Sequence, residues 1–249
     1  MKKARKILLT LCAALLLVTM SVGATLAYLT SKDSVTNTFT TGEVEIYLNE
    51  AVVMQDENEN YVVNTDATHR VKENNYTMYP GGSYKKDPTI YVTTESEDCY
   101  VAAEVVLTTN GDLLDLIPAT SNENEKFIGF GELVKDGIFA QTFGTPTEDD
   151  NGNLVVENSE WKLVQFPAVG DAENGYTRKF HIFRKTVVAK NDTTKNFVLF
   201  DRIEIPENWN NDQVAKLNGM TMDITAYGVQ EAGMANCEDA MAKAGYITE

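Results

Sequence analysis

The residues of this chain that could support catalysis are few. Its two histidines, His69 and His181, stand far apart in the sequence, and neither belongs to a His-Glu-x-x-His helix. Such a helix supplies two of the protein ligands with which a catalytic zinc ion activates water. The chain also has no Gly-x-Ser-x-Gly turn to expose a serine, and no cysteine has a histidine beside it. We therefore predict no catalytic residue, metal ligand or cofactor, and expect both histidines to be strand residues.

One acidic run is faintly similar to a calcium-binding loop. It begins at Asp56 and continues through Asn60. Tyr61 stands where an EF-hand needs glycine, and Ala67 stands where the EF-hand needs its closing glutamate. We interpret the run as the solvated tip of a hairpin, and a weak calcium site elsewhere in this acidic chain stays open.

Two cysteines lie beyond the N-terminal region, in different structural patterns. Cys99 opens a strand pattern, and Cys237 lies in a helical pattern. Two cysteines in more than two hundred residues are not a disulfide framework. Either a Cys99–Cys237 disulfide or two separately buried thiols fits the sequence.

The first 27 residues have the parts of an export signal. Four basic residues precede an apolar run from Ile7 to Val18, and Thr25 and Ala27 are small enough for the −3 and −1 positions of a cleavage site. We expect cleavage before Tyr28. The apolar run is short for a membrane span, and no later segment is more apolar. We thus expect a secreted chain, extracellular or at the cell surface, with no stable membrane span after cleavage.

The charge of the mature chain limits its partners. Cleavage would leave 222 of the 249 residues, with 17 basic residues instead of 21 and all 37 acidic ones, a net charge of −20. Nucleic acid and anionic lipid both require positive protein surface. We therefore expect neither of them as a partner.

Alternation of polar and apolar residues, typical of half-buried strands, dominates the mature chain. It predicts strands at 43–48, 52–54, 61–63, 89–93, 100–107, 154–156, 161–166, 180–188, 197–205 and 220–227. Turns are predicted at 79–82 and 149–152, where proline, glycine and Asx residues gather. Many short strands with few helices predict an all-β fold, an antiparallel jelly-roll-like sandwich, with an immunoglobulin-like sandwich as the alternative.

Helical spacing occurs in three places. Short helices are predicted at 212–217 and 236–244, the second with Asn236 as its N-cap and an apolar face of Cys237, Met241 and Ala244. The region 112–143 loses strict alternation, and the apolar residues Leu133, Val134 and Ile138 there fit short helical pieces. We divide the chain into a signal peptide (1–27), an N-terminal segment (28–42) and one jelly-roll-like domain (43–249).

Several blocks resemble one protein family. The run 27–33 followed by 36–44 looks like the start of the TasA/camelysin family of Gram-positive bacteria, whose precursors are cleaved by a signal peptidase of the SipW type. Blocks at 86–89, 97–101, 199–209 and 224–230 resemble later parts of SipW-dependent biofilm matrix proteins. The resemblance covers most of the chain and is weak from about 112 to 160.

The resemblance implies a subunit of extracellular biofilm matrix fibres, self-associating and joined by accessory matrix proteins. In such fibres the freed N-terminal segment of one copy completes the sheet of the next. Here residues 28–41 contain neither proline nor glycine, and the candidate donor strand is Val35, Thr36, Asn37, Thr38 and Phe39. The side chains of Val35 and Phe39 would share one face of that strand. The segment could instead be the first strand of its own domain.

Other members of this family are described as camelysin, a surface metalloendopeptidase. Two alternatives to a fibre subunit therefore stand, a secreted camelysin-like peptidase and a monomeric surface adhesin. The chain has no recognisable zinc motif, so we favour the structural subunit.

Overall fold

The computed structural model describes residues 43–110, 133–171 and 173–247. These residues all belong to one compact unit, 42–249. The predicted cleavage site, with Thr25, Ala27 and Tyr28, and the candidate donor strand 35–39 lie outside the described residues.

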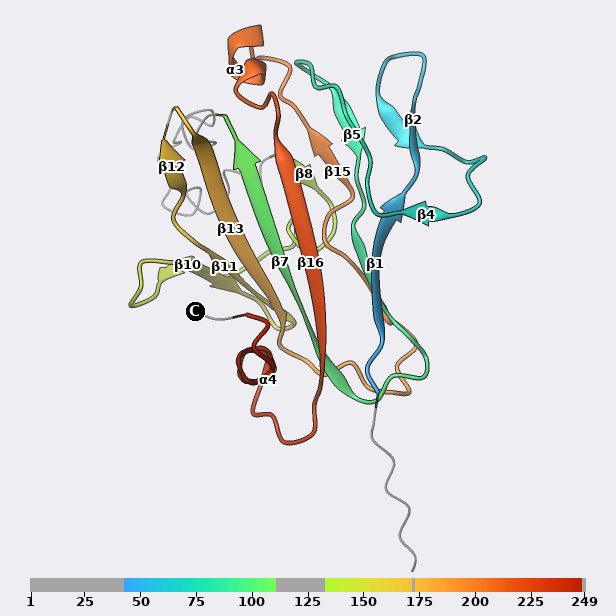
Figure 1. The fold of residues 1–249 in the computed structure, drawn as a ribbon, viewed down its shortest axis with the longest axis vertical. Coiled ribbons are helices and arrows are strands. Elements are labelled where there is room, and N and C mark those ends of the chain that lie inside the picture. The colour runs from blue at the N-terminus through green and yellow to red at the C-terminus, as the bar shows by residue number, and fades with distance from the viewer. Residues whose placement is uncertain (1–42, 111–132, 172, 248–249) are drawn as a thin grey trace, which may run out of the picture. The chain divides into compact units, whose positions relative to one another are not determined.

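The described chain is an all-β fold, which confirms the predicted class (Figure 1). Its largest sheet has seven strands in the order β16-β7-β13-β11-β10-β9, with β12 paired to β13, and all its pairs are antiparallel. The strands are β7 (Cys99–Thr109), β9 (Thr147–Glu148), β10 (Leu154–Glu157), β11 (Trp161–Gln165), β12 (Val169–Asp171), β13 (Gly175–Arg184) and β16 (Thr221–Gln230).

Two smaller sheets make up the rest of the strand structure. One has the order β14-β6-β1-β4, from β1 (Ile46–Ala51), β4 (Arg70–Val71), β6 (Thr89–Val92) and β14 (Asn196–Val198). The other has the order β2-β3-β5-β15-β8, from β2 (Val53–Gln55), β3 (Tyr61–Val63), β5 (Ser83–Lys85), β8 (Val134–Lys135) and β15 (Arg202–Glu204). Between β3 and β5 the pairing is parallel, at a single position.

The main core lies between the seven-stranded sheet and the smaller sheets. Alternate residues of β7, from Val101 to Leu107, share it with Phe180 and Ile182 of the neighbouring β13. Tyr84, Ile90, Phe197 and Ile203 come from the smaller sheets. Strands buried on one face and packed sheet on sheet form a sandwich. The finer jelly-roll assignment stays a prediction.

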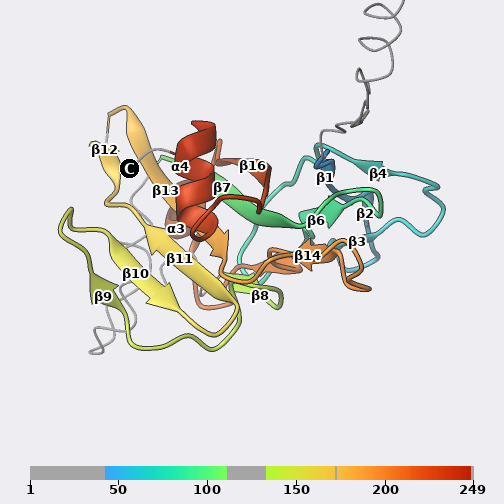
Figure 2. The same cartoon turned by 90° about the horizontal axis from the view of Figure 1, so that it is seen from below.

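Helix α4 (Cys237–Ala244) packs on the outer face of the seven-stranded sheet (Figure 2). Its predicted N-cap is confirmed, since Asn236 Oδ1 accepts from the backbone N–H of Asp239 at 2.8 Å. The predicted apolar face is wrong at Ala244, which is exposed. The chain reverses just after it, at Gly245, and Ile247 is buried in the cluster instead.

The helical prediction for the middle region is wrong in its described part. Val134 begins β8, which pairs with β15, and Ile138 follows a turn. Asp136 and Gly137 adopt φ of 57° and 74°, a left-handed conformation that a helix cannot contain. A Cβ at Gly137 would lie 2.6 Å from Cα of Phe200, so glycine is required there.

The turns form largely as predicted. Hairpins join β2 to β3 and β9 to β10. At the first tip, Asp56 Oδ1 accepts from the backbone N–H of Asn58 and of Asn60, both at 2.9 Å, which is the Asx chemistry of a solvated turn. Helix α3 (Asn211–Ala215) begins with a capping box between Asn210 and Gln213.

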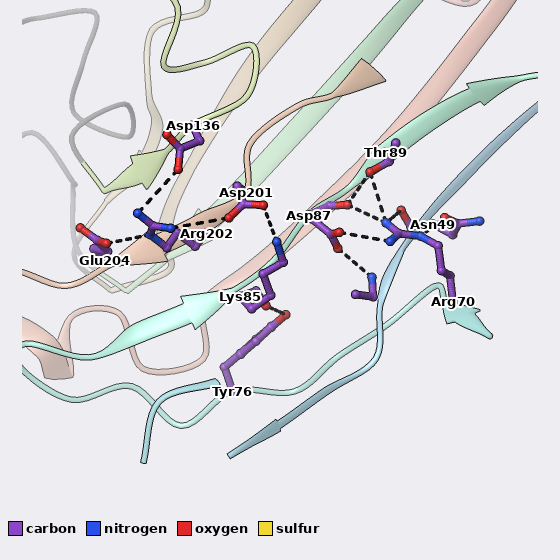
Figure 3. A network of polar contacts seen from close by, with 11 residues as sticks. Asn49, Arg70, Tyr76, Lys85, Asp87, Thr89, Asp136, Asp201, Arg202 and Glu204 are labelled. Carbon is purple, nitrogen blue, oxygen red and sulfur yellow. Dashed lines mark hydrogen bonds and ion pairs between the residues drawn. The ribbon is translucent and has the colours of Figure 1, made fainter. Parts of the chain in front are cut away.

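Polar contacts join strands within the two smaller sheets (Figure 3). The guanidinium of Arg70 donates to Oδ1 of Asn49 at 2.6 Å and to Oδ2 of Asp87 at 3.1 Å. The other carboxylate oxygen of Asp87 accepts from the backbone N–H of Ala51 at 2.7 Å. Lys85 and Lys86 form ion pairs with Asp201 and Glu50. Charged side chains in the block 85–87 therefore hold β1, β4 and β15 in place.

Candidate functional site

The outer edge of β16 is an open strand edge. This strand ends the seven-stranded sheet and pairs with β7 over all ten of its residues. Within the described residues, no strand pairs with its other side. A long edge with unpaired N–H and C=O groups is a template for another strand.

The register of β16 shows which backbone groups face outward. Glu231 donates its backbone N–H to Asp98 O at 2.8 Å, so this pair faces β7. Hydrogen-bonded and non-hydrogen-bonded pairs alternate in an antiparallel ladder. The N–H and C=O groups of Met222, Ile224 and Ala226 therefore point away from β7. The side chains of these three residues pack against the main core.

A groove of about 810 Å³ lies beside the first part of β16. The beginning of β16, helix α3 and the segment 72–80 form its walls. Its lining is mixed, with charged residues such as Glu50, Glu73 and Asp223 beside an apolar part rich in methionine and tyrosine. The apolar part includes Tyr76, Met78, Tyr79, Ile203, Val214, Leu217, Met220 and Met222. Methionine side chains adapt to differently shaped apolar partners. The groove can therefore receive apolar side chains.

The wall opposite β16 is extended chain that belongs to no strand. Along residues 74–78, half-buried and exposed residues alternate. Side chains anchor the segment instead of a ladder: Asn74 Nδ2 donates to Ala51 O, and the Tyr76 hydroxyl donates to Lys85 O, each at 2.8 Å. Burial, and then the charges of Glu50 and Asp87, raise the pKa of Tyr76, so its hydroxyl stays protonated as a donor.

The far part of β16 lies against the start of the domain. Gly228 lies against Val44 and Ile46, and a Cβ there would be 2.9 Å from Val44 Cγ1 and from Ile46 Cγ2. Glu43 and Glu45 are held by backbone bonds, since Glu97 N–H donates to Glu43 O and Thr93 N–H donates to Glu45 O, both at 3.0 Å. The first residues of the domain therefore lie beside Gly228, near the end of β16. The groove lies beside the beginning of the same strand.

Only one of the two histidines lies in a strand. His69 is exposed in a bend just before β4, so the expectation of a strand residue is wrong there. His181 is in β13 as expected, 3% exposed between Phe166 and Phe183, with Nε2 3.0 Å from Oε2 of Glu104. Burial lowers the pKa of His181, and the hydrogen bond with Glu104 partly offsets this. Among the described residues, no group of three or more His, Cys, Asp or Glu side chains could hold a metal ion.

Of the two alternatives for the cysteines, the structure has the two separately buried thiols and no Cys99–Cys237 disulfide, since both thiols are free and buried. Cys99 belongs to the main core, whereas Cys237 belongs to the cluster under α4 on the other face of the sheet. The thiol of Cys237 donates to the carbonyl oxygen of Val101 in β7 at 3.4 Å. The backbone of β7 thus separates the sulfurs. Burial raises the pKa of Cys99 to about 11 and that of Cys237 to about 12.

Comparison with known proteins adds no relative. No family model, no curated protein and no solved structure matches the chain. In the described part of the chain, no helix is long and apolar enough to span a membrane.

Strand alternation predicted β16, but neither its open edge nor the groove was predicted. Two residues carried a signal. Asp223 places a charge within the strand, near its beginning, as edge strands often do. Gly228 is a glycine inside a strand pattern, which marks the close approach of another part of the chain, here the side chains of Val44 and Ile46.

Proposed function

We propose that the mature chain is a secreted, non-enzymatic subunit of extracellular biofilm matrix fibres. Its freed N-terminal segment would add as a strand to the sheet of the next subunit. The observation that carries this proposal is the outer edge of β16, which no described strand covers. The N-terminal run resembles that of SipW-dependent matrix proteins, and this resemblance supports the biofilm matrix as the location. The expected partners are a SipW-type signal peptidase and accessory matrix proteins.

An open edge of this length is unusual for a domain that stays monomeric. Soluble proteins protect edge strands with short length, charges or a covering segment. On β16 the exposed side chains are mainly Thr221, Asp223 and Thr225, so a single charged residue lies between two threonines. Threonine favours strand structure, and this row suits pairing.

The position of the chain entry supports growth in one direction. The N-terminal segment joins the domain at Glu43, close to Gly228, while the groove lies beside Met220 to Asp223. Donor and acceptor would therefore occupy different surfaces of each subunit. Contacts between two different surfaces continue from copy to copy and produce open filaments.

Phe39 provides the test of this function. The purified mature protein, Tyr28 to Glu249, is compared by electron microscopy with Phe39→Asp and with the conservative control Phe39→Leu. We expect fibres from the parent and the control and none from Phe39→Asp, because a buried charged side chain in place of the phenylalanine would lose its hydration without gaining a partner. Fibres of normal length from Phe39→Asp would contradict the proposed function.

A further inference from the structure

We infer that Tyr227 and Tyr246 form a site of oxidative cross-linking, at which a one-electron oxidant joins the two phenol rings within one subunit. Tyr227 belongs to β16 and packs against the cluster under α4, and Tyr246 follows the end of α4. Their rings are stacked, with 5.2 Å between the ring centroids and 22° between the ring planes. The modification needs no fibre assembly, so it goes beyond the proposed function.

The end of α4 holds Tyr246 in place. Gly245 ends the helix with φ of 70°, and the backbone N–H of Tyr246 donates to Met241 O at 3.1 Å. The next residue, Ile247, is buried in the cluster under α4. A helix cap on one side and a buried side chain on the other therefore fix the backbone of Tyr246. Its ring is 51% exposed, so an oxidant in solution can reach it.

Tyr227 lies on the sheet as the partner of this ring. Its cross-strand neighbour in β7 is Ala102, a small residue that leaves the tyrosine ring to pack on larger neighbours. Offset stacking is a preferred arrangement of two aromatic rings. Burial, and then the charge of Glu104, raise the pKa of Tyr227, so its phenol is protonated at neutral pH. Oxidation of this phenol therefore releases a proton together with the electron.

The cross-linking reaction needs an oxidant from outside the chain. Two equivalents of a one-electron oxidant, such as a peroxidase intermediate or Ru(III), each accept one electron, and each phenol gives its proton to the solvent. The two tyrosyl radicals combine, and a C–C bond forms between the ring carbons beside the two oxygens. The hydrogen on each of these carbons then moves to the neighbouring oxygen, which restores both phenols. In total the pair loses two electrons and two protons.

A second group of tyrosines is less suited to this reaction. Its rings have centroids 5.0 to 6.1 Å apart, and its members are Tyr61, Tyr76, Tyr79 and Tyr84. Three of the four contacts are edge-to-face, so one ring presents its face and not its reactive carbons. The hydroxyl of Tyr76 donates to Lys85 O at 2.8 Å, and that of Tyr84 accepts from the backbone N–H of Tyr79 at 2.7 Å. These rings are held by the fold, and Tyr84 is fully buried.

The cross-link would tie helix α4 to the sheet. It would close a loop of residues 228–245, and this loop contains the whole of α4. Closing such a loop lowers the conformational entropy of the unfolded chain. Cys99 and Cys237 provide no covalent closure, because both are free and lie on opposite faces of the sheet. The tyrosine pair could supply it.

Tryptic digestion reports the cross-link directly. Cleavage after Lys216 and Lys243 releases the peptide 217–243, whose single tyrosine is Tyr227, and the peptide 244–249, whose single tyrosine is Tyr246. The purified mature protein is oxidised at high dilution with light-activated ruthenium tris-bipyridyl and persulfate, and denatured monomer is isolated and digested. We expect mass spectrometry to find the two peptides joined, with two hydrogen atoms missing from their summed mass.

Phenylalanine variants test which side chains react. Tyr227→Phe and Tyr246→Phe keep a stacked ring but remove the phenol, so each should abolish the joined peptides. Tyr47→Phe is the matched control, because Tyr47 is 49% exposed and no ring contact between described residues involves it. Its yield of joined peptides should equal that of the parent. Thermal melting verifies that all three variants are folded.

The dependence on protein concentration separates coupling within one subunit from coupling between copies. The fraction of joined peptides should stay constant over a roughly tenfold dilution. Joined peptides found only in dimers, or a yield that falls in proportion to dilution, would overturn the inference. Absence of joined peptides from the folded parent, under conditions that couple free tyrosine, would also overturn it. Neither result bears on the proposed function, which is tested by fibre formation.

Discussion

Gly228 of β16 lies so close to Ile46 of β1 that a Cβ on Gly228 would be 2.9 Å from Ile46 Cγ2. This contact places the start of the domain against one part of an otherwise open strand edge. The first part of β16, from Thr221 to Asp223, lines the groove. The two ends of β16 therefore have different neighbours: the start of the domain packs against one end, and the groove lies beside the other.

Gly228→Ala should destabilise the domain. The added methyl group cannot fit until Val44 and Ile46 move, and overpacking of this kind costs about 1 to 3 kcal/mol. Chemical denaturation of the purified protein measures the loss. Gly144→Ala is the control, because Gly144 is exposed and a Cβ there would meet only Glu157 O at 3.4 Å. Equal stability of the two variants would contradict the close contact.

Both thiols of the mature protein should be protected while it is folded. Cys99 and Cys237 are fully buried, and burial raises the pKa of each to about 11 and about 12, so the reactive thiolate is scarce at neutral pH. A thiol-reactive dye should label neither cysteine in native buffer and both in denaturant without reductant. Absence of labelling in denaturant would mean that the two sulfurs are bridged.

His181 should make the domain sensitive to mild acid. Its folded-state pKa lies below its ordinary value of 6.5, so the folded protein binds fewer protons than the unfolded chain. Stability should therefore be full above pH 6.5 and fall as the pH decreases through 6.5 toward the lowered pKa. Glu104 faces His181 and Lys179. Burial alone would raise the pKa of Glu104, but hydrogen bonds from His181 and Lys179 lower it. The contribution of Glu104 to stability is therefore lost only at lower pH.

His181→Gln should remove the loss of stability that begins near pH 6.5. Melting temperatures between pH 8 and pH 5 measure the effect. His69→Gln is the matched control, because this exposed histidine lies outside the packed sheets, and its profile should follow the parent. A parent protein with a constant melting temperature down to pH 5 would show that His181 is not a buried neutral histidine.

Asp87→Ala should cost about 3 kcal/mol of stability. Its carboxylate accepts from the Arg70 guanidinium and from the backbone N–H of Ala51, and the side chain is only 14% exposed. Glu157→Ala is the comparison, because Glu157 pairs with Lys185 at the surface and exposed pairs contribute less than about 1 kcal/mol. Denaturant unfolding of the two variants should separate them clearly, and similar losses would contradict the structural role of Asp87.

The local structure of this chain was largely readable from its sequence. Strand alternation identified β7, β11 and β13, and Asn236 with Gly245 marked the beginning and end of α4. These signals act over a few residues, so periodicity and capping chemistry report them directly. The misread run around Leu133 to Ile138 has helical spacing, but Asp136 and Gly137 turn the chain through left-handed conformations.

The groove could not be read from the sequence. It joins residues 72–80 to residues 211–223, and nothing in either run specifies that they meet. The choice between a disulfide and two buried thiols could not be made for a similar reason. The strand pattern of Cys99 and the helical pattern of Cys237 do not show that the two thiols lie on opposite faces of the sheet. A local pattern shows which residues of a strand share a face, but it does not show what that face packs against.

The central claim is that the segment 28–41 joins subunits instead of completing its own domain. Electron microscopy and thermal melting of the mature protein, 28–249, beside the truncated chain 42–249 test it most directly. The sheets of residues 43–247 enclose a buried core of their own, so the truncated chain should melt close to the parent. We predict fibres from the mature protein and a folded, soluble monomer from the truncated chain. Fibres of normal length from the truncated chain, or loss of its folded state, would contradict the claim.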